Sequence, residues 1–343
     1  MSWRKLSLIL LVLLVLSLGL NAYLYWTIRS IEEKMTTVHV KIGTMKAFSY
    51  LPIHVAYALG YFKDEGLDVE LVFFGSGSKN REALIAGDVD FSSLATVHIL
   101  IARGKGCPVK IIGALQNMEF FDLLVRNDLR GKVKELKDLK GLRIGISAPG
   151  SGSWAWCVVY LKKAGLDPDK DVKLVSVDGV MTMYSALKAK KVDAVIAWNP
   201  LTVRAIKEGL GFVLINVHDR ETHLEYVGSE EALSGVLATS EDFIEKRPDI
   251  VIKVIKAVNR GLKYIQTHSP EEIAKAVASI YEGLDLDTLT EAIRYEMPTY
   301  PRNLAVSESA FNVEVETYLS VGIIKEEIEY AEAVEWSLTG WRP

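Results

Sequence analysis

The residues best suited to hold a ligand are the small and hydroxyl residues in the stretch Leu142 to Trp156. Its pattern predicts a buried strand at Leu142–Ile146, a loop of Pro, Gly and Ser, and a helix entered at Ser151 to Trp154. Glycine lets a backbone approach a ligand closely, and the free N–H groups of a first helical turn favour an anion or a polar oxygen. Ser151 or Ser153 can cap this helix. The same residues would also suit an ordinary turn before a helix, so the rest of the chain must decide between the two.

Motifs for catalysis are almost absent from the sequence. There is no G-x-S-x-G elbow, and Gly75–Ser78 lacks the Lys-Ser/Thr pair of a phosphate-binding loop. Gly150–Ala155 does match the dinucleotide pattern G-x-G-x-x-A, with Asp171 or Asp178 further on, but it lies in the middle of the chain. No CxxC or HExxH occurs, and the six histidines are scattered. We therefore expect no catalytic residue, no metal site and no cofactor.

The composition is that of a globular protein and gives nucleic-acid binding no electrostatic support. Of the 343 residues, 49% are hydrophobic and 24% are charged, and the net charge is −4 without any Lys/Arg-rich run. This length predicts two domains or one large one.

Residues 1–29 form a separate N-terminal segment. Arg4 and Lys5 precede an uncharged run from Leu6 to Leu20, long enough with its apolar continuation to cross a bilayer. The alternative is a cleaved signal peptide, but Ala22 with Leu20 two residues before it is a poor cleavage site. We favour an uncleaved transmembrane anchor, and in both cases the globular part lies outside the cytoplasm.

The sequence contains two copies of one unit. Three short motifs recur in the same order about 100 residues further on. Strands alternate with helices in each copy, which predicts an α/β protein with mostly parallel sheets. The paired motifs are Ile42-Gly43 with Ile144-Gly145, Gly66-Leu67-Asp68 with Gly165-Leu166-Asp167, and Ala83-Leu84 followed by Val89-Asp90-Phe91 with Ala186-Leu187 followed by Val192-Asp193-Ala194. We expect a short strand at Val89–Phe91, and we expect Asp90 and Asp193 to hydrogen-bond turns at the strand entries.

Two extended apolar segments, Phe120–Arg126 and Leu233–Thr239, follow the first and the second copy. We interpret them as strands that cross between two lobes and form a hinge. This gives lobe I as residues 36–119 plus 236–343 and lobe II as residues 120–235. The segment from Glu241 onward is helical, with an amphipathic helix at Pro248–Thr267, and we expect these helices to pack on lobe I.

The candidate site follows from this arrangement. In open α/β sheets ligands bind beyond the carboxyl ends of the strands, and in two facing lobes these ends line a cleft. The residues there are rich in hydroxyls and aromatic rings and poor in cations, which suits hydrogen bonding and ring contact. Trp156, inside a helix, is expected in the core. The candidate ligand-binding residues are Ser49, Tyr50, Ser76, Gly77, Ala95, Thr96, Gln116, Ser151, Gly152, Ser153, Trp154, Trp198 and Asn199.

From about Val38 to its C-terminus the chain resembles the periplasmic substrate-binding proteins of ABC importers. The resemblance is to the group that handles nitrate, sulfonates, taurine and thiamine-pyrimidine precursors. The segments that carry it are Ser49–Pro52, Gly60–Phe62, Glu65–Val69, Ala83–Phe91, Asp138–Gly145 with Gly150–Gly152, and Val192–Trp198.

The resemblance implies a type II periplasmic-binding-protein fold, with two α/β lobes and a two-strand hinge, here behind an N-terminal membrane anchor. It further implies a monomeric extracytoplasmic protein that closes over a small organic anion or a ring-bearing compound. The partners would be an ABC permease and its ATPase subunits. Members often have Asp where this chain has Asn199, which weakens the case for a ligand with an ammonium group, such as taurine.

Two other functions fit the same sequence. One is an enzyme of pyrimidine or menaquinone synthesis on this fold, although those enzymes work in the cytoplasm. The other is a ligand-sensing ectodomain, which would need a cytoplasmic signalling part, and only five residues precede the apolar run.

Overall fold

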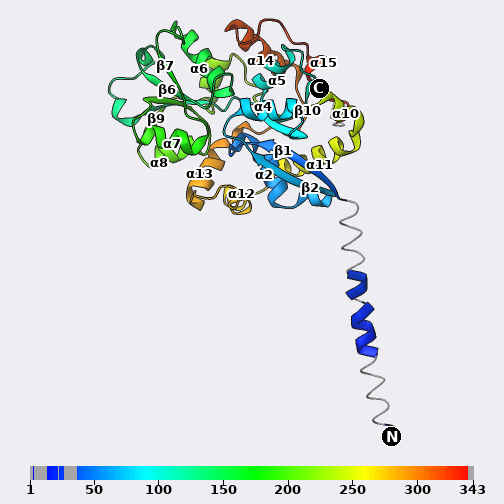
Figure 1. Cartoon of the computed structure of the whole chain (residues 1–343). Helices are drawn as coiled ribbons and strands as arrows, with labels where there is room; N and C mark the ends of the chain where they lie inside the picture. The colour runs from blue at the N-terminus through cyan, green and yellow to red at the C-terminus, as the bar shows by residue number, and fades with distance from the viewer. Residues whose placement is uncertain (1–2, 4–13, 22, 27–36, 339–343) are drawn as a thin grey trace.

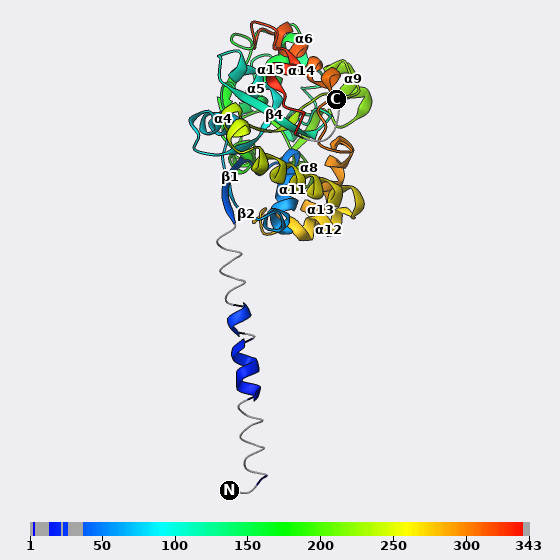
Figure 2. The same cartoon turned by 90° about the vertical axis from the view of Figure 1, so that its right-hand side faces the viewer.

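The computed structural model describes residues 3, 14–21, 23–26 and 37–338. Two lobes lie side by side, and the helical residues 14–21 and 23–26 stand away from both of them (Figures 1 and 2). Most of the expected membrane anchor, including residues 4–13, 22 and 27–29, lies outside the described residues. Within the described part of the chain, no helix has the length and apolar character needed to cross a membrane.

The sheet of lobe I has five strands in the order β2-β1-β3-β10-β4. Strand β1 pairs in parallel with β2 and β3, whereas β10 is antiparallel to both β3 and β4. The strands are β1 (Val38–Thr44), β2 (Leu67–Phe73), β3 (Phe91–Ala95), β4 (Val109–Gln116) and β10 (Gly235–Ser240). The helices among them are α2 (Leu51–Ala58), α3 (Tyr61–Asp64), α4 (Gly77–Ala86) and α5 (Thr96–Arg103).

The sheet of lobe II repeats this plan in the order β7-β6-β8-β5-β9, again with one antiparallel strand, β5. Its strands are β5 (Asp122–Arg126), β6 (Arg143–Ile146), β7 (Lys173–Ser176), β8 (Ala194–Ala197) and β9 (Gly211–Ile215). Its helices are α6 (Gly152–Lys163), α7 (Val180–Lys188), α8 (Leu201–Lys207) and α9 (Arg220–Val227).

The predicted repeat extends to individual hydrogen bonds. Asp90 accepts a bond from the backbone N–H of Lys41 (2.7 Å). Its counterpart Asp193 accepts one from the N–H of Arg143 (2.9 Å) and also pairs with the Arg143 guanidinium. Each carboxylate therefore holds the turn before one strand to the start of another, which is a structural role.

The two crossing segments are those that the sequence indicates. Strand β5 follows β4 of lobe I along the chain but pairs with β8 and β9 of lobe II. Strand β10 follows lobe II but pairs with β3 and β4 of lobe I. The entrances of the two segments are bonded to each other, because the N–H of Ala232 donates to the carbonyl of Asn117 (2.9 Å) and the Ser234 hydroxyl donates to the carbonyl of Met118.

The C-terminal helices are α10 (Glu241–Lys246), α11 (Pro248–Thr267), α12 (Pro270–Val277), α13 (Leu286–Glu296), α14 (Glu308–Ser320) and α15 (Tyr330–Ala333). Helix α11 packs against α2 and α3 of lobe I, and its apolar face is buried. The expectation that all these helices pack on lobe I is only partly right. Helix α13 contacts α8 of lobe II (Figure 1), and α14 contacts both α5 and α6 (Figure 2).

One strand lies later in the chain than the sequence suggested. The expected strand was Val89–Phe91, followed by a loop, but β3 runs through Ser92 and Ser93 to Ala95. Serine is a common turn residue. Here the buried hydroxyls are satisfied inside the lobe, because Ser92 donates to Asn80 Oδ1 and Ser93 donates to Thr44 Oγ1 (both 2.8 Å).

Candidate ligand-binding cleft

The two lobes meet along the carboxyl ends of their strands and are closed against each other. Arg81 Nη1 of α4 donates to the carbonyl of Gly150 in lobe II (3.3 Å). The N–H of Phe48 donates to the carbonyl of Asn199 (3.1 Å). At the rim, Lys79 Nζ lies 3.6 Å from Asp178 Oδ1, also across the two lobes.

A small inner cavity of about 10 Å³ remains at the bottom of the cleft. It lies between both lobes and the first crossing segment. Six of the predicted residues line it, namely Tyr50, Gly77, Ala95, Gly152, Ser153 and Trp198. The other lining residues are Met45, Ala47, His98, Phe120, Phe121 and Ser147.

A larger outer cavity of about 300 Å³ lies at the mouth of the cleft. Met45 and Trp198 line both cavities, so the two are neighbouring compartments of one cleft. The outer compartment is mostly apolar, with Phe73 and Phe74 from lobe I and Val180 and Met181 from lobe II.

At Gly152 the walls of the inner cavity leave no room for a side chain. A Cβ atom on this residue would lie 2.7 Å from Phe121 Cε2 and 3.1 Å from the Cβ of Ala95 in lobe I. Carbon atoms pack at about 3.5–4.0 Å. A side chain at position 152 would therefore crowd the Phe121 ring of lobe II and, in the closed cleft, Ala95 of lobe I.

Serine hydroxyls fix the loop before α6. Ser151 caps the helix by accepting a bond from the N–H of Trp154 (3.2 Å). Ser153 accepts a bond from the N–H of Ser147 and also bonds the Ser147 hydroxyl (both 2.9 Å). In lobe I, Ser76 caps α4 in the same way. Two capped helix N-termini, those of α4 and α6, thus face each other across the cleft.

His98 presents a hydrogen-bond donor to the inner cavity. Arg81 Nη1 lies 3.4 Å from His98 Nδ1, and because a guanidinium only donates, Nδ1 is the acceptor and Nε2 carries the proton. The Nε2 atom would be 2.2 Å from a Cβ on Gly77, so it lies directly against the α4 N-terminus. Burial, assisted by the Arg81 charge, lowers the pKa of His98 to about 3. The imidazole is therefore neutral at physiological pH.

Several predicted residues lie beside the cleft without lining a cavity. Thr96 donates to the carbonyl of Leu233 in the second crossing segment. Ser49 is buried, and its hydroxyl has no hydrogen-bond partner among the residues that the structure describes. Trp154 is half-buried, and its ring packs on the core without reaching either cavity. Trp156 lies in the core, as expected.

Gln116 and Asn199 belong to a buried charged cluster behind the cleft. Both side-chain amides donate to the carboxylate of Glu296 at the end of α13. His218 joins this carboxylate to Asp122 of β5, at 3.1 Å and 3.2 Å. Burial alone lowers the pKa of His218, but the two carboxylates outweigh it and raise the pKa to about 10. The cluster ties together β4, β5, the loops after β8 and β9, and α13.

Sequence reasoning did not identify Met45, Ala47, His98, Phe120, Phe121 and Ser147 as lining residues. Phe120 and Phe121 were predicted to belong to the hinge, and their contact with the cavity was not predicted. His98 is the third residue of α5, after the loop in which we expected ligand-binding residues, and its ring faces α4. In the sequence, only its closeness to Thr96 at the start of the helix indicated that it could line the cleft.

The topology is that of the periplasmic-binding-protein fold, in which two α/β lobes are joined by two crossing strands. A protein of known structure from Bordetella bronchiseptica RB50 is 26% identical, with a TM-score of 0.82 over 89% of this chain and 96% of its own. The alkanesulfonate-binding protein SsuA from Xanthomonas axonopodis pv. citri, bound to MOPS, gives a TM-score of 0.72 at 19% identity, covering 88% of this chain and 99% of its own.

The sequence model described as NMT1/THI5 like matches residues 47–273, and the chain belongs to that family. Two curated relatives differ in their named activity. One is a Bacillus subtilis protein named for binding aliphatic sulfonates, 26% identical over 81% of this chain and 79% of its own. The other is the Candida albicans 4-amino-5-hydroxymethyl-2-methylpyrimidine phosphate synthase, 27% identical over 66% of each chain.

Proposed function

We propose that the protein is the extracytoplasmic solute-binding component of an ABC importer. It captures a small organic anion or ring-bearing compound between its lobes and delivers it to a permease. The observation that carries the proposal is the convergence of Tyr50 and Gly77 of lobe I with Gly152, Ser153 and Trp198 of lobe II on one cavity. A ligand there contacts both lobes and so favours the closed state.

The chemistry of the inner compartment suits an acceptor group on the ligand. His98 Nε2 is a donor, and the N-termini of α4 and α6 add the positive ends of their dipoles. Arg81, buried behind His98, contributes a positive charge. A sulfonate, a carboxylate or nitrate would each find hydrogen-bond donors and a nearby positive charge here, and the sulfonate-binding relative fits this chemistry.

The outer compartment suits the body of the ligand. Its aromatic and apolar side chains, with Trp198 at the junction, provide ring contacts for a hydrocarbon chain or a heterocycle. Because the inner compartment holds only about 10 Å³, room for about one water, the lobes must separate to admit a molecule and then close on it less tightly than in this structure. The charged head would enter first, and the apolar body would remain near the mouth.

Binding suits the cleft better than catalysis does. The hydroxyls of Ser147 and Ser153 bond each other, and neither bonds an imidazole or a carboxylate that could act as its base. His98 has its pKa lowered to about 3, too low for a general base working near neutral pH. The synthase relative keeps the enzyme as the competing hypothesis.

The extracytoplasmic location belongs to the same proposal. It is supported by the positively charged start and apolar run of the first 29 residues, together with the named role of the sulfonate-binding relative. Membrane attachment through an uncleaved segment is the form we favour. Release of the protein into the soluble fraction with a shortened N-terminus, measured by intact mass, would contradict it.

The test of function is a thermal-shift screen of the full chain against alkanesulfonates of increasing length, MOPS, nitrate and 4-amino-5-hydroxymethyl-2-methylpyrimidine. A ligand present at about 100 times its dissociation constant stabilises the folded state by about 2.7 kcal/mol. We expect at least one compound to raise the melting temperature, with no chemical turnover detected by mass spectrometry. Conversion of the pyrimidine or its precursors by the purified protein would favour the enzyme instead.

A further inference from the structure

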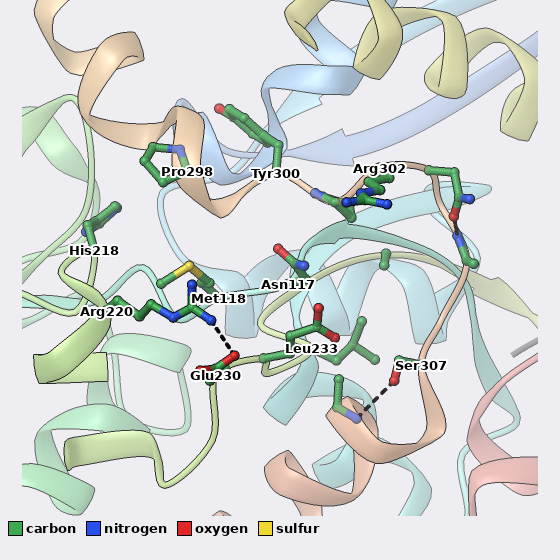
Figure 3. Close-up of a pocket in the computed structure, with 16 residues that line it drawn as sticks. Asn117, Met118, His218, Arg220, Glu230, Leu233, Pro298, Tyr300, Arg302 and Ser307 are labelled. Carbon is green, nitrogen blue, oxygen red and sulfur yellow. Dashed lines mark hydrogen bonds and ion pairs between the residues drawn. The ribbon is translucent and has the colours of Figure 1, made fainter. Parts of the chain in front are cut away.

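A further cavity lies away from the cleft, beside the hinge. It measures about 640 Å³ and shares no lining residue with either compartment of the cleft. The chain at the entrance to each crossing segment contributes to it, through Asn117 and Met118 before the first and Glu230, Glu231 and Leu233 at the second (Figure 3). The segment from Pro298 to Ala310 closes it from the remaining side. We call it the hinge cavity.

The walls of the hinge cavity are held in place by the backbone. The N–H of Asn117 donates to the carbonyl of Thr299 (3.0 Å), and the N–H of Ala114 donates to the carbonyl of Leu304 (3.0 Å). Gln266 Nε2 of α11 donates to the carbonyl of Pro301 (2.6 Å). Pro298 and Pro301 further restrict the segment. The cavity is therefore preformed, as small-molecule sites usually are.

Most charges around the hinge cavity are already paired. Arg220 forms an ion pair with Glu230, drawn in Figure 3. His218 is held between Asp122 and Glu296. Arg302 is different, because no carboxylate among the residues that the structure describes pairs with it. Asn117 also lines the cavity, with no hydrogen bond to its side-chain amide in that part of the chain.

These two unpaired donors define the polar end of a ligand. A guanidinium matches a carboxylate in geometry and binds it with two parallel bonds. The N-terminus of α14, at Ser307, lies in the same wall and adds a positive dipole end. Glu231 also lines the cavity and disfavours a second negative charge. The rest of the lining includes Met118, Leu233, Pro298 and Tyr300, which suit an apolar body (Figure 3).

We propose that the hinge cavity is a second ligand-binding site, which takes a small organic molecule with one carboxylate on an apolar body. The carboxylate pairs with Arg302 and accepts a bond from the Asn117 amide. The apolar body contacts Met118, at the entrance to the first crossing segment, and Leu233, at the start of the second. This proposal does not depend on the identity or existence of a ligand in the cleft.

The test uses hexanoate as the probe and methyl-¹³C-methionine NMR of the full chain as the readout. Met118 lines the hinge cavity, whereas Met45 and Met181 line the cleft, so the methyl signals report which site is occupied. A Met118→Leu variant assigns the signal. We expect hexanoate to shift the Met118 signal with a dissociation constant on the order of 1 mM, as befits so small a ligand. Hexanamide, which has the same size without the charge, should bind at least severalfold more weakly.

Variants then test the named contacts. Arg302→Gln should weaken hexanoate binding roughly tenfold, the usual scale of a charge-assisted bond. The matched control is Arg260→Gln, an arginine on α11 that pairs with Asp64 outside the cavity, and it should leave the affinity unchanged. The proposal is overturned if the Met118 signal does not respond, if only Met45 or Met181 responds, or if Arg302→Gln binds as well as the wild type. Stronger binding of inorganic phosphate than of hexanoate would refute the ligand class.

Discussion

Replacing Gly152 by valine should prevent the lobes from closing while leaving each lobe folded. The added Cβ would lie 2.7 Å and 2.8 Å from two ring carbons of Phe121 and 3.1 Å from the Cβ of Ala95. That is an overlap of roughly 1 Å against a normal carbon contact. The Phe121 ring cannot simply turn away, because it packs on Phe120 and Trp198, with centroids 4.3 Å and 5.8 Å apart. Because Phe121 lies in the same lobe as Gly152, the ring must be displaced toward lobe I, and opening makes room for it by withdrawing Ala95.

Overpacking of this kind costs about 1–3 kcal/mol, which corresponds to a loss of roughly 5- to 150-fold in affinity for a ligand that requires closure. The assay is calorimetric titration with the compound that most stabilises the wild type in the thermal-shift screen. Small-angle X-ray scattering at saturation should show a larger radius of gyration for the variant. Gly131→Val is the matched control, because a Cβ at position 131 meets no atom within 4 Å. Equal affinity and equal radius of gyration for Gly152→Val and the wild type would refute the steric argument.

Three further predictions concern the hinge and the cleft. Burial raises the pKa of Glu119 to about 8 and that of Glu314 well above its ordinary value. Because the folded state favours the neutral carboxyl groups, their contribution to the free energy of unfolding is present at acid pH and is lost as the pH rises toward and through 8. The free energy of unfolding from urea titrations should therefore fall between pH 5 and pH 8, by at most about 1.4 kcal/mol per pH unit for each group, and Glu314→Gln should flatten this slope; a flat profile in the wild type would exclude the shifts. His218 has a raised pKa of about 10, so its contribution to stability is complete below its ordinary pKa of about 6.5 and is lost only as the pH rises through 10. Asp122→Asn leaves part of this buried charged cluster uncompensated and should lower the free energy of unfolding at pH 7 by about 3–5 kcal/mol in denaturant titrations. A decrease below about 1 kcal/mol would show that the cluster contributes little. Trp198→Ala removes a side chain shared by both compartments and should abolish detectable binding of the best-stabilising compound in calorimetry, with a loss of stability of about 3–5 kcal/mol. Trp198→Phe keeps part of the ring contact and should bind measurably. Full affinity in Trp198→Ala would show that this residue is not part of the site.

Much of the fold could be predicted because hydrophobic patterns and repeated motifs report local structure. Amphipathic spacing predicted α11 at Pro248–Thr267, which matches the observed bounds. The extended segment after each copy predicted one crossing strand, β5 after the first copy and β10 after the second, since an apolar run without a helical period favours a strand. The repeat even anticipated Asp90 and Asp193 as turn-binding carboxylates. All of these depend on contacts that are local or repeated in each lobe.

The failures concern contacts between distant segments. The packing of α13 on α8 and of α14 on α6 depends on three-dimensional complementarity that no single segment displays. Gln116 and Asn199 sit at strand ends, as a ligand-binding residue would, but Glu296 lies far along the chain and engages both amides. His98 was missed for the converse reason, because its orientation is set by Arg81 on another helix. Strand ends therefore indicate where the cleft is, and tertiary partners decide which side chains remain free to bind.

Native mass spectrometry after saturation with the best-stabilising compound of the screen can show whether a ligand is held between the closed lobes. The measurement compares the wild type, Gly152→Val and Gly131→Val at equal concentration. We predict one compound per chain in the wild type and in Gly131→Val, and none or little in Gly152→Val. Equal occupancy of all three proteins would place the ligand outside the cleft and would contradict a binding site between the lobes.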